Sequence, residues 1–128
     1  MKFLLDTAAF LFAATDDPRF SLSSRAILDD PGHRVFLSAA SAWEIGLKHA
    51  RGKLLLPEPP DRYVPRIRQE MGIETVPVGE ETALRAGRLP DLHRDPFDRL
   101  LVSQAISMGM TILTPDEAIR QYPVPTVW

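Results

Sequence analysis

The residues best suited to chemistry are four acids that stand close to the starts of predicted helices. They are Asp6, Glu44, Asp98 and Asp116. Two carboxylates ~4 Å apart repel by about 4 kcal/mol at an effective dielectric near 20, so a group of acids needs protons or a cation. Oxygen ligands alone favour Mg²⁺ or Mn²⁺ over zinc. Because such a cation polarises a phosphodiester and activates water, the four acids predict metal-dependent phosphoryl transfer.

Each of these acids also has a purely structural interpretation. Asp6 can cap the helix that follows it, and Asp98 can stabilise a helix dipole from the first turn. Ser41 and Glu44 have the spacing of a capping box, in which Glu44 would only reach back to the helix start. Residues 114–117 predict another capped start, which would account for the fourth acid. The residues alone therefore leave four unrelated helix-start acids as the competing interpretation.

The helix that contains Asp98 has the clearest start signal in the chain. Asp95 can accept a hydrogen bond from the first turn, and Pro96 fits the first helical position. The pattern predicts that this helix ends near Gly109. Four of its residues follow helical spacing and are expected to bury one face: Leu101, Val102, Ala105 and Ile106.

Short apolar runs alternate with helical patterns, which predicts an α/β fold with a central parallel sheet and helices on both sides. The expected strands are residues 2–5, 35–37, 74–78, 111–113 and 125–128. The expected helices are residues 8–14, 23–30, 39–51, 61–71 with Pro65 in the first turn, 81–88 and 96–109. Right-handed crossovers bring the carboxyl ends of all strands to one rim, where ligands bind in open sheets. We therefore expect the four acids to converge on that rim.

Length and composition limit the classes of protein to consider. With 128 residues and 45% hydrophobic content, residues 1–128 are expected to form a single domain. A formal net charge of −2 excludes a polycation that coats nucleic acid, so any such binding must be local. The absence of cysteine excludes thiolate metal sites, and only three histidines argue against a zinc site. We expect no membrane association and a soluble, cytoplasmic protein.

Several stretches, spread from the first strand to the last, form a pattern shared with a known family. They are residues 4–7 (LLDT), 41–45 (SAWEI) with 52–54 (GKL), 93–101 (HRDPFDRLL) with 104–105 (QA), and 113–116 (LTPD). Together they resemble the PIN domain, and within it the VapC-type toxins of type II toxin–antitoxin systems. The run from residue 95 to 105 is the most specific part of the resemblance.

The resemblance implies a three-layer PIN-like fold with a central parallel sheet of about five short strands flanked by helices. It also implies a Mg²⁺- or Mn²⁺-dependent endoribonuclease that a cognate antitoxin inhibits and that commonly forms a homodimer. Asp6, Glu44 and Asp98 match the family's acidic triad, and Asp116 matches its more variable fourth acid. Many relatives carry a histidine two residues after the first acid. This chain has Ala8 there, so no histidine base can act at that position.

Threonines and basic residues near the acids are candidates for contacts with RNA. Thr7 and Thr114 could hydrogen-bond a ligand, a carboxylate or a metal-bound water. His93 could donate to a phosphate, although capping or packing explains it as well. Five basic residues are candidates for holding the RNA backbone, with a solvated or structural role as the alternative for each: Lys48, Arg51, Lys53, Arg94 and Arg99. Hydrolysis by a water attacking in line would leave a 5′-phosphate and a 3′-hydroxyl.

Three functional hypotheses follow. The first is the ribonuclease toxin, whose antitoxin would lie across apolar ground near Trp43, Leu54 and Leu56 and place a basic side chain in the acidic pocket. The second is a catalytically silent PIN-like module that binds a protein partner. The third is a phosphatase-like α/β protein with Asp6 as nucleophile. It is weak, because Ala8 stands where hydrolases of the haloacid dehalogenase type have a second acid.

Overall fold

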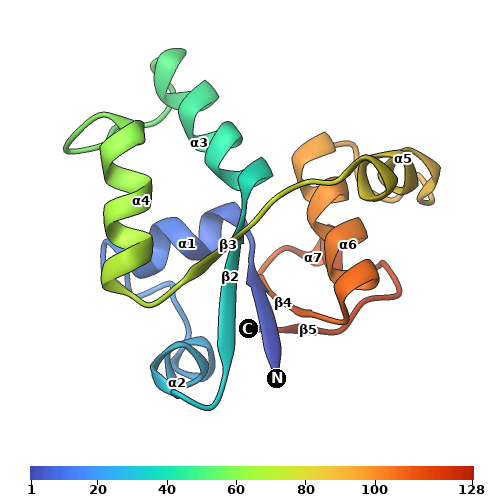
Figure 1. The fold of residues 1–128 in the computed structure, drawn as a ribbon, viewed down its shortest axis with the longest axis horizontal. Helices are drawn as coiled ribbons and strands as arrows, with labels where there is room; N and C mark the ends of the chain where they lie inside the picture. The colour runs from blue at the N-terminus through green and yellow to red at the C-terminus, as the bar shows by residue number, and fades with distance from the viewer.

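A five-stranded parallel sheet forms the centre of the protein. The computed structural model covers residues 1–128 and orders the strands β3-β2-β1-β4-β5 (Figure 1). The strands are β1 (Lys2–Leu5), β2 (Arg34–Ser38), β3 (Glu74–Val76), β4 (Thr111–Leu113) and β5 (Thr126–Val127). From β1 the chain first builds the sheet in one direction and then returns to add β4 on the other side. The carboxyl ends of β1 and β4 therefore flank a topological switch point, where open sheets bind ligands.

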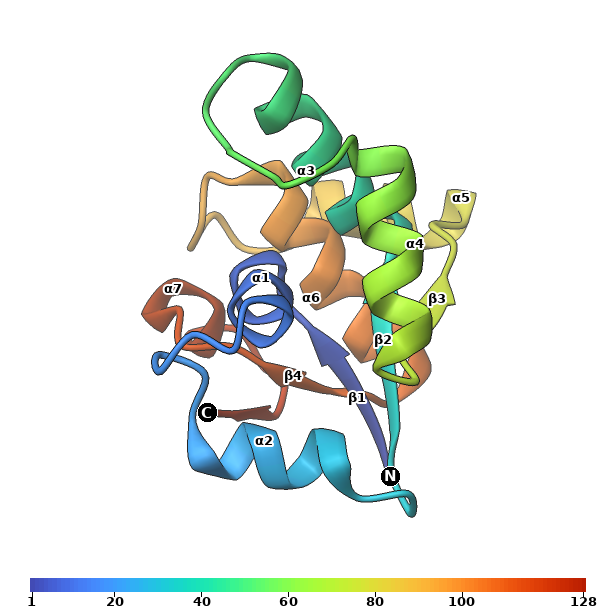
Figure 2. The same ribbon diagram turned by 90° about the vertical axis from the view of Figure 1, so that its left-hand side faces the viewer.

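Seven helices pack around this sheet. They are α1 (Thr7–Ala14), α2 (Leu22–Asp29), α3 (Ala39–Ala50), α4 (Pro60–Glu70), α5 (Glu80–Arg88), α6 (Pro96–Met108) and α7 (Glu117–Arg120). Figure 1 shows α1, α2 and α4 on one side of the strands and α5 and α6 on the other. Figure 2 shows the carboxyl end of β1 pointing towards α1, with α3 beyond it. The predicted three-layer α/β arrangement is confirmed. None of the helices combines the length and the apolar character needed to cross a membrane.

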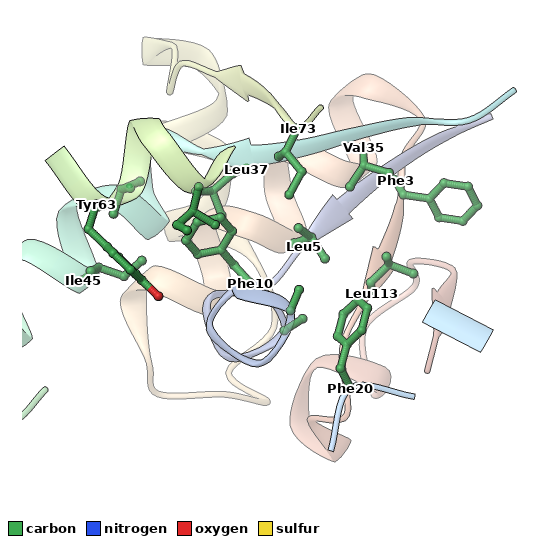
Figure 3. Packing of buried hydrophobic residues seen from close by; sticks show 14 residues of the cluster. Phe3, Leu5, Phe10, Phe20, Val35, Leu37, Ile45, Tyr63, Ile73 and Leu113 are labelled. Carbon is green, nitrogen blue, oxygen red and sulfur yellow. The ribbon is translucent and has the colours of Figure 1, made fainter. Parts of the chain in front are cut away.

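Alternation along β1 divides the core into two halves. Phe3 and Leu5 face the layer that contains α1 and α4, whereas Leu4 packs with residues of α6 and α7. Figure 3 shows Leu5 within the first half, which also contains Phe10 and Val35. Since both faces of β1 are covered, its sequence is a continuous apolar run rather than an alternating one.

The predicted boundaries of α6 are confirmed. The side chain of Asp95 accepts a hydrogen bond of 2.9 Å from the N–H of Phe97, and Pro96 is the first helical residue. Gly109 ends the helix at a φ of 65°, a left-handed conformation that glycine adopts without strain. Three of the four residues expected on the buried face are buried. The prediction for Ile106 is wrong, because it is 37% exposed and lies beside the stripe that contacts the sheet.

One local prediction about α4 is also wrong. Pro65 does not lie in the first turn, since α4 begins at Pro60 and Pro65 stands inside the helix. Proline there has no N–H to donate to the carbonyl of Asp61 and forfeits one helical hydrogen bond. The buried residues Tyr63, Val64 and Ile67 hold α4 against the core despite this loss.

Leu5→Ala is expected to lower the free energy of unfolding by about 2–5 kcal/mol, because it truncates a side chain with no exposed surface at the centre of the sheet. Chemical denaturation of the wild type and the variant measures the difference. Leu22→Ala is the matched control: Leu22 is 89% exposed, so this truncation should change stability by less than about 0.5 kcal/mol. Equal effects of the two substitutions would contradict this description of the core.

Candidate metal centre

The carboxyl ends of β1 and β4 place Asp6 beside Thr114. Leu5 pairs with Leu113 in the parallel register, so the residues that follow them lie at the same rim. Asp6 Oδ1 accepts a hydrogen bond of 2.7 Å from the backbone N–H of Ala9, and Thr114 Oγ1 donates to Asp6 Oδ2. Asp6 therefore caps α1 with one oxygen, while Thr114 fixes the other.

Burial raises the pKa of Asp6 to about 6, because the residue is only 4% exposed and little water reaches its carboxylate. The hydrogen bonds from Thr114 and Ala9 lower this pKa, whereas the charges of Asp116 and Glu44 raise it. The interpretation of Asp6 as a helix cap is confirmed. A capping role alone does not require a carboxylate whose charged form is so disfavoured.

Glu44 reaches the same region from the middle of α3. The predicted capping box is wrong, because α3 begins after Ser38, whose Oγ accepts a hydrogen bond of 3.0 Å from the N–H of Ala40. This earlier start places Glu44 well inside the helix instead of in its first turn. The Glu44 carboxylate is buried, accepts a hydrogen bond of 2.6 Å from Thr7 Oγ1 and pairs with Lys48 Nζ.

Asp98 approaches the rim from the first turn of α6. Because Asp95 caps this helix, the carboxylate of Asp98 has no capping role. The pKa of Asp98 is raised to about 7, first by burial and then by the charges of Asp95 and Asp6, while His93 acts in the opposite direction. The sequence pattern predicts only a capping role for Asp95, but its charge also raises the pKa of Asp98.

Asp116 and His93 complete the group. Asp116, not Thr114, is the N-cap of α7, because its Oδ1 accepts a hydrogen bond of 2.8 Å from the N–H of Ala118. His93 Nε2 lies 2.9 Å from Asp98 Oδ2 and 3.2 Å from Asp116 Oδ2. One donor atom from each of these three residues lies within 4.8 Å of the others. Sequence reasoning did not connect His93 with the acids, although it stands in the same motif as Asp98.

One hollow of about 240 Å³, the acidic hollow, contains all four acids that the sequence singled out. Its charged lining consists of Asp6, Glu44, Lys48, Asp95, Asp98 and Asp116. The four acids come from the ends of β1 and β4 and from α3 and α6, so convergence at one rim is observed. The interpretation as four unrelated helix-start acids does not account for this geometry.

Of the three partners considered for Thr7 and Thr114, the structure shows a carboxylate for each. Thr7 donates to Glu44, and Thr114 donates to Asp6. Among the predicted basic contacts, Lys48 lies at the acidic hollow with half of its side chain exposed. Its pKa is raised, mainly by the hydrogen bond to Glu44.

The side chain of Arg99 makes hydrogen bonds within the protein, which favours a structural role over the RNA contact that the sequence suggested. Its side chain is 16% exposed and its two terminal nitrogens donate to backbone carbonyls. The acceptors are the carbonyls of Ala86, Leu89, Pro90 and His93. Arg94, by contrast, is exposed, as are Arg51 and Lys53.

The donor atoms of the acidic hollow fit a hard divalent cation. Carboxylate oxygens are the ligands that Mg²⁺ and Mn²⁺ prefer, and the chain has no cysteine to offer a soft ligand. Burial first, and neighbouring acids second, raise the pKa values of Asp6 and Asp98, so a nearby cation would favour their charged forms. Asp6, Glu44, Asp98 and Asp116 are the residues that would hold such an ion.

The fold and this acidic group agree with a family match. The model of the PIN domain family matches residues 3–125 of the sequence. The chain belongs to the PIN domain family. The predicted resemblance to this family is thereby confirmed.

The chain is also similar to individual proteins of known sequence or structure. Ribonuclease VapC16 from Mycobacterium tuberculosis (strain ATCC 25618 / H37Rv) is 43% identical over 65 residues, which are 51% of this chain and 45% of that protein. VapBC2 from Rickettsia felis, in a crystal structure with a DNA fragment from their promoter, gives a TM-score of 0.74 at 16% identity, over 99% of this chain and 98% of that one. VapBC-1 from nontypeable Haemophilus influenzae gives a TM-score of 0.67 at 16% identity, over 99% of this chain and 97% of that one. At such identities the structural likeness establishes the fold.

Asp98→Asn is expected to make the metal-free protein relatively more stable as pH rises. A folded-state pKa raised from 3.8 to about 7 means that the folded protein holds this proton more tightly than the unfolded chain. Ionisation of Asp98 therefore costs stability progressively across that interval, and an amide cannot ionise. Unfolding in the presence of EDTA at several pH values measures the difference from the wild type.

Asp29→Asn, at an exposed position of α2, is the matched control for this pH experiment. Its difference from the wild type should stay nearly constant between the same pH values. A constant difference for Asp98→Asn as well would show that the carboxyl of Asp98 is not buried among other acids.

Proposed function

We propose that this chain is a Mg²⁺- or Mn²⁺-dependent endoribonuclease and the toxin of a type II toxin–antitoxin system. The observation that carries the proposal is the acidic hollow, in which Asp6, Glu44, Asp98 and Asp116 meet at the switch point of a PIN-domain sheet. Acids with perturbed pKa values gather at functional sites more often than stability alone requires.

The relatives support the choice of substrate and partner. The name of ribonuclease VapC16 supports RNA as the substrate, and the VapBC structures support an antitoxin as the partner. The matched stretch spans 45% of VapC16, so the activity, the RNA and the antitoxin of this chain all belong to the proposal.

The chemistry proposed for the site is hydrolysis of a phosphodiester by water. A divalent cation bound by the acids would neutralise charge on the phosphate and lower the pKa of the attacking water. The protein's own part is to hold four carboxylates together, and Thr7 and Thr114 orient two of them. Water attacking in line would leave a 5′-phosphate and a 3′-hydroxyl, without using the RNA 2′-hydroxyl as nucleophile.

Asp6→Asn and Asp98→Asn are each expected to lower RNA cleavage by at least about 100-fold, because each removes a charged ligand while keeping the size of the side chain. Purified protein without antitoxin is incubated with structured RNA and Mn²⁺ or Mg²⁺, and the rate and the end groups are measured. Glu81→Gln, on the exposed surface of α5, is the matched control and should cleave like the wild type.

Two results of this cleavage experiment would contradict the proposal. Equal cleavage by the wild type and by both asparagine variants would indicate a contaminating nuclease. No cleavage of any RNA by the wild type would favour the catalytically silent PIN-like module instead. A covalent acyl-phosphate on Asp6 would revive the phosphatase-like hypothesis.

Arg94→Ala is expected to weaken RNA binding similarly for all sequences and to reduce the slope of log affinity against log salt by about 0.7, the contribution of one phosphate contact on a single strand. Fluorescence anisotropy on the Asp98→Asn background, from about 50 to about 200 mM salt, measures the slope without cleavage. Arg62→Ala, at an exposed position of α4, is the control. An unchanged slope for Arg94→Ala would place the RNA elsewhere.

The proposed antitoxin surface is apolar and partly open. Trp43 is 62% exposed and contacts the ring of Phe97 edge-on at 5.0 Å between ring centres. Leu54 and Leu56 line a second hollow of about 240 Å³, which also contains Tyr63. An amphipathic segment of the antitoxin would cover these side chains.

Replacing Trp43, Leu54 and Leu56 by serine is expected to weaken antitoxin binding at least about 10-fold, because apolar anchors carry most of the affinity of such interfaces. Calorimetry with the protein encoded by the neighbouring reading frame measures the affinity. Leu22→Ser, which changes another exposed leucine, should leave it unchanged. Wild-type affinity in the triple variant would remove this surface from the proposal.

The homodimer implied by the family resemblance and a cytoplasmic location stay predictions. Light scattering of the purified protein tests the first. The proposal for the acidic hollow does not depend on either.

A further inference from the structure

We propose that His93 is a positioning residue of the metal centre, which donates a hydrogen bond to Asp116, lies in contact with Asp98 and does not itself bind the cation. The inference rests on the proposed function, since it assigns a role within that centre. His93 Nε2 lies 2.9 Å from Asp98 Oδ2 and 3.2 Å from Asp116 Oδ2. These contacts link the two acids that come from α6 and from the start of α7.

The distances alone do not separate a metal ligand from a hydrogen-bond donor. Neighbouring ligands of an octahedral ion with bonds of about 2.1 Å lie about 3 Å apart, which is also the length of an N–H···O hydrogen bond. The group formed by His93, Asp98 and Asp116, with donor atoms within 4.8 Å of one another, is compatible with both. The second nitrogen of the imidazole ring decides between them.

The backbone N–H of Asp95 donates a hydrogen bond to His93 Nδ1 at 3.3 Å. A nitrogen that accepts a hydrogen bond carries no proton, so the neutral ring has its proton on Nε2. Nε2 then faces Asp98 and Asp116 as a donor. Binding a cation through Nε2 would move the proton to Nδ1, where it would point at the N–H of Asp95 with no acceptor between them.

The backbone of His93 is anchored on both sides of its side chain. Its N–H donates to Tyr122 Oη at 3.0 Å, and its carbonyl accepts from Arg99 at 3.4 Å. Tyr122 Oη in turn donates to the carbonyl of Pro90 at 2.9 Å, and Arg99 donates to the same carbonyl at 3.1 Å. Both backbone groups of His93 are therefore anchored, and its side chain is only 19% exposed.

The contacts explain how the more exposed acid is kept in the centre. The side chain of Asp116 is 36% exposed and that of Asp98 is 15% exposed. Oδ1 of Asp116 is held by the N–H of Ala118, and the contact with His93 holds its Oδ2. One ring nitrogen that contacts both carboxylates, and is hydrogen-bonded to that of Asp116, fixes their spacing before a cation arrives. Hydrogen bonds to metal-binding carboxylates are worth about 10–100-fold in metal affinity.

The first test is the tautomer of His93 in the metal-free full chain. Nitrogen-15 NMR distinguishes a ring protonated at Nε2 from one protonated at Nδ1, and the His93→Gln variant assigns the signals. We expect protonation at Nε2 alone. A ring protonated at Nδ1, with or without a proton on Nε2, would overturn the proposal.

The second test is Mn²⁺ binding by calorimetry. His93→Ala is expected to bind Mn²⁺ about 10–100-fold more weakly than the wild type. His93→Gln should restore much of the affinity, because its side-chain amide can donate to the same carboxylates. Wild-type affinity in His93→Ala would overturn the proposal, and thermal unfolding of both variants checks that they fold.

The third test is the electron spin-echo spectrum of Mn²⁺ bound to the wild type. We expect no signal from a coordinated histidine nitrogen. A nitrogen signal that disappears in His93→Ala would make His93 a ligand and would overturn the proposal. Asp6→Asn, which removes a proposed ligand, is the control that the Mn²⁺ signal comes from this centre. If the wild type bound no Mn²⁺, the proposed function would fail, while the tautomer would still decide whether His93 donates to Asp116.

Discussion

Repulsion among buried carboxylates is the constraint on which the rest of the structure depends. Each of three elements at the rim contributes an acid and has a hydrogen-bond donor or a cationic group beside it that offsets the charge. Helix α1 offers Asp6 the N–H of Ala9, α3 offers Glu44 the ammonium of Lys48, and the segment before α6 offers Asp98 the ring of His93. These groups compensate the charge incompletely, and the remaining deficit is the physical reason for proposing a cation in the acidic hollow.

Much of the fold follows from local features of the sequence. Strand β1 is covered on both faces, so its residues Phe3 to Leu5 form an uninterrupted apolar run that is recognisable without the structure. The start of α6 is equally local, because Asp95 and Pro96 act within a single turn. Asp6 and Asp116 could be placed at one rim because they follow two strands of a sheet whose crossovers have a fixed hand.

Other features depend on contacts between distant residues and could not be predicted. The position of Glu44 depended on whether Ser38 or Ser41 caps α3, and both serines fit a helix start. The entry of His93 into the acidic group depends on Arg99 and on Tyr122, which lies 29 residues further along the chain. Local patterns carry no information about such a pairing.

Helices α6 and α1 both begin with an acid at this rim, but they differ in which residue can be replaced during evolution. On α6 the tasks are divided, since Asp95 caps the helix and Asp98 faces the acidic hollow, so another capping residue could replace Asp95 and spare the second carboxylate. On α1 both tasks fall to Asp6, one oxygen for each. Serine would keep the helix start but lose the second oxygen, and glutamate would move both. Position 6 should therefore drift more slowly than position 95 among descendants that keep the same chemistry.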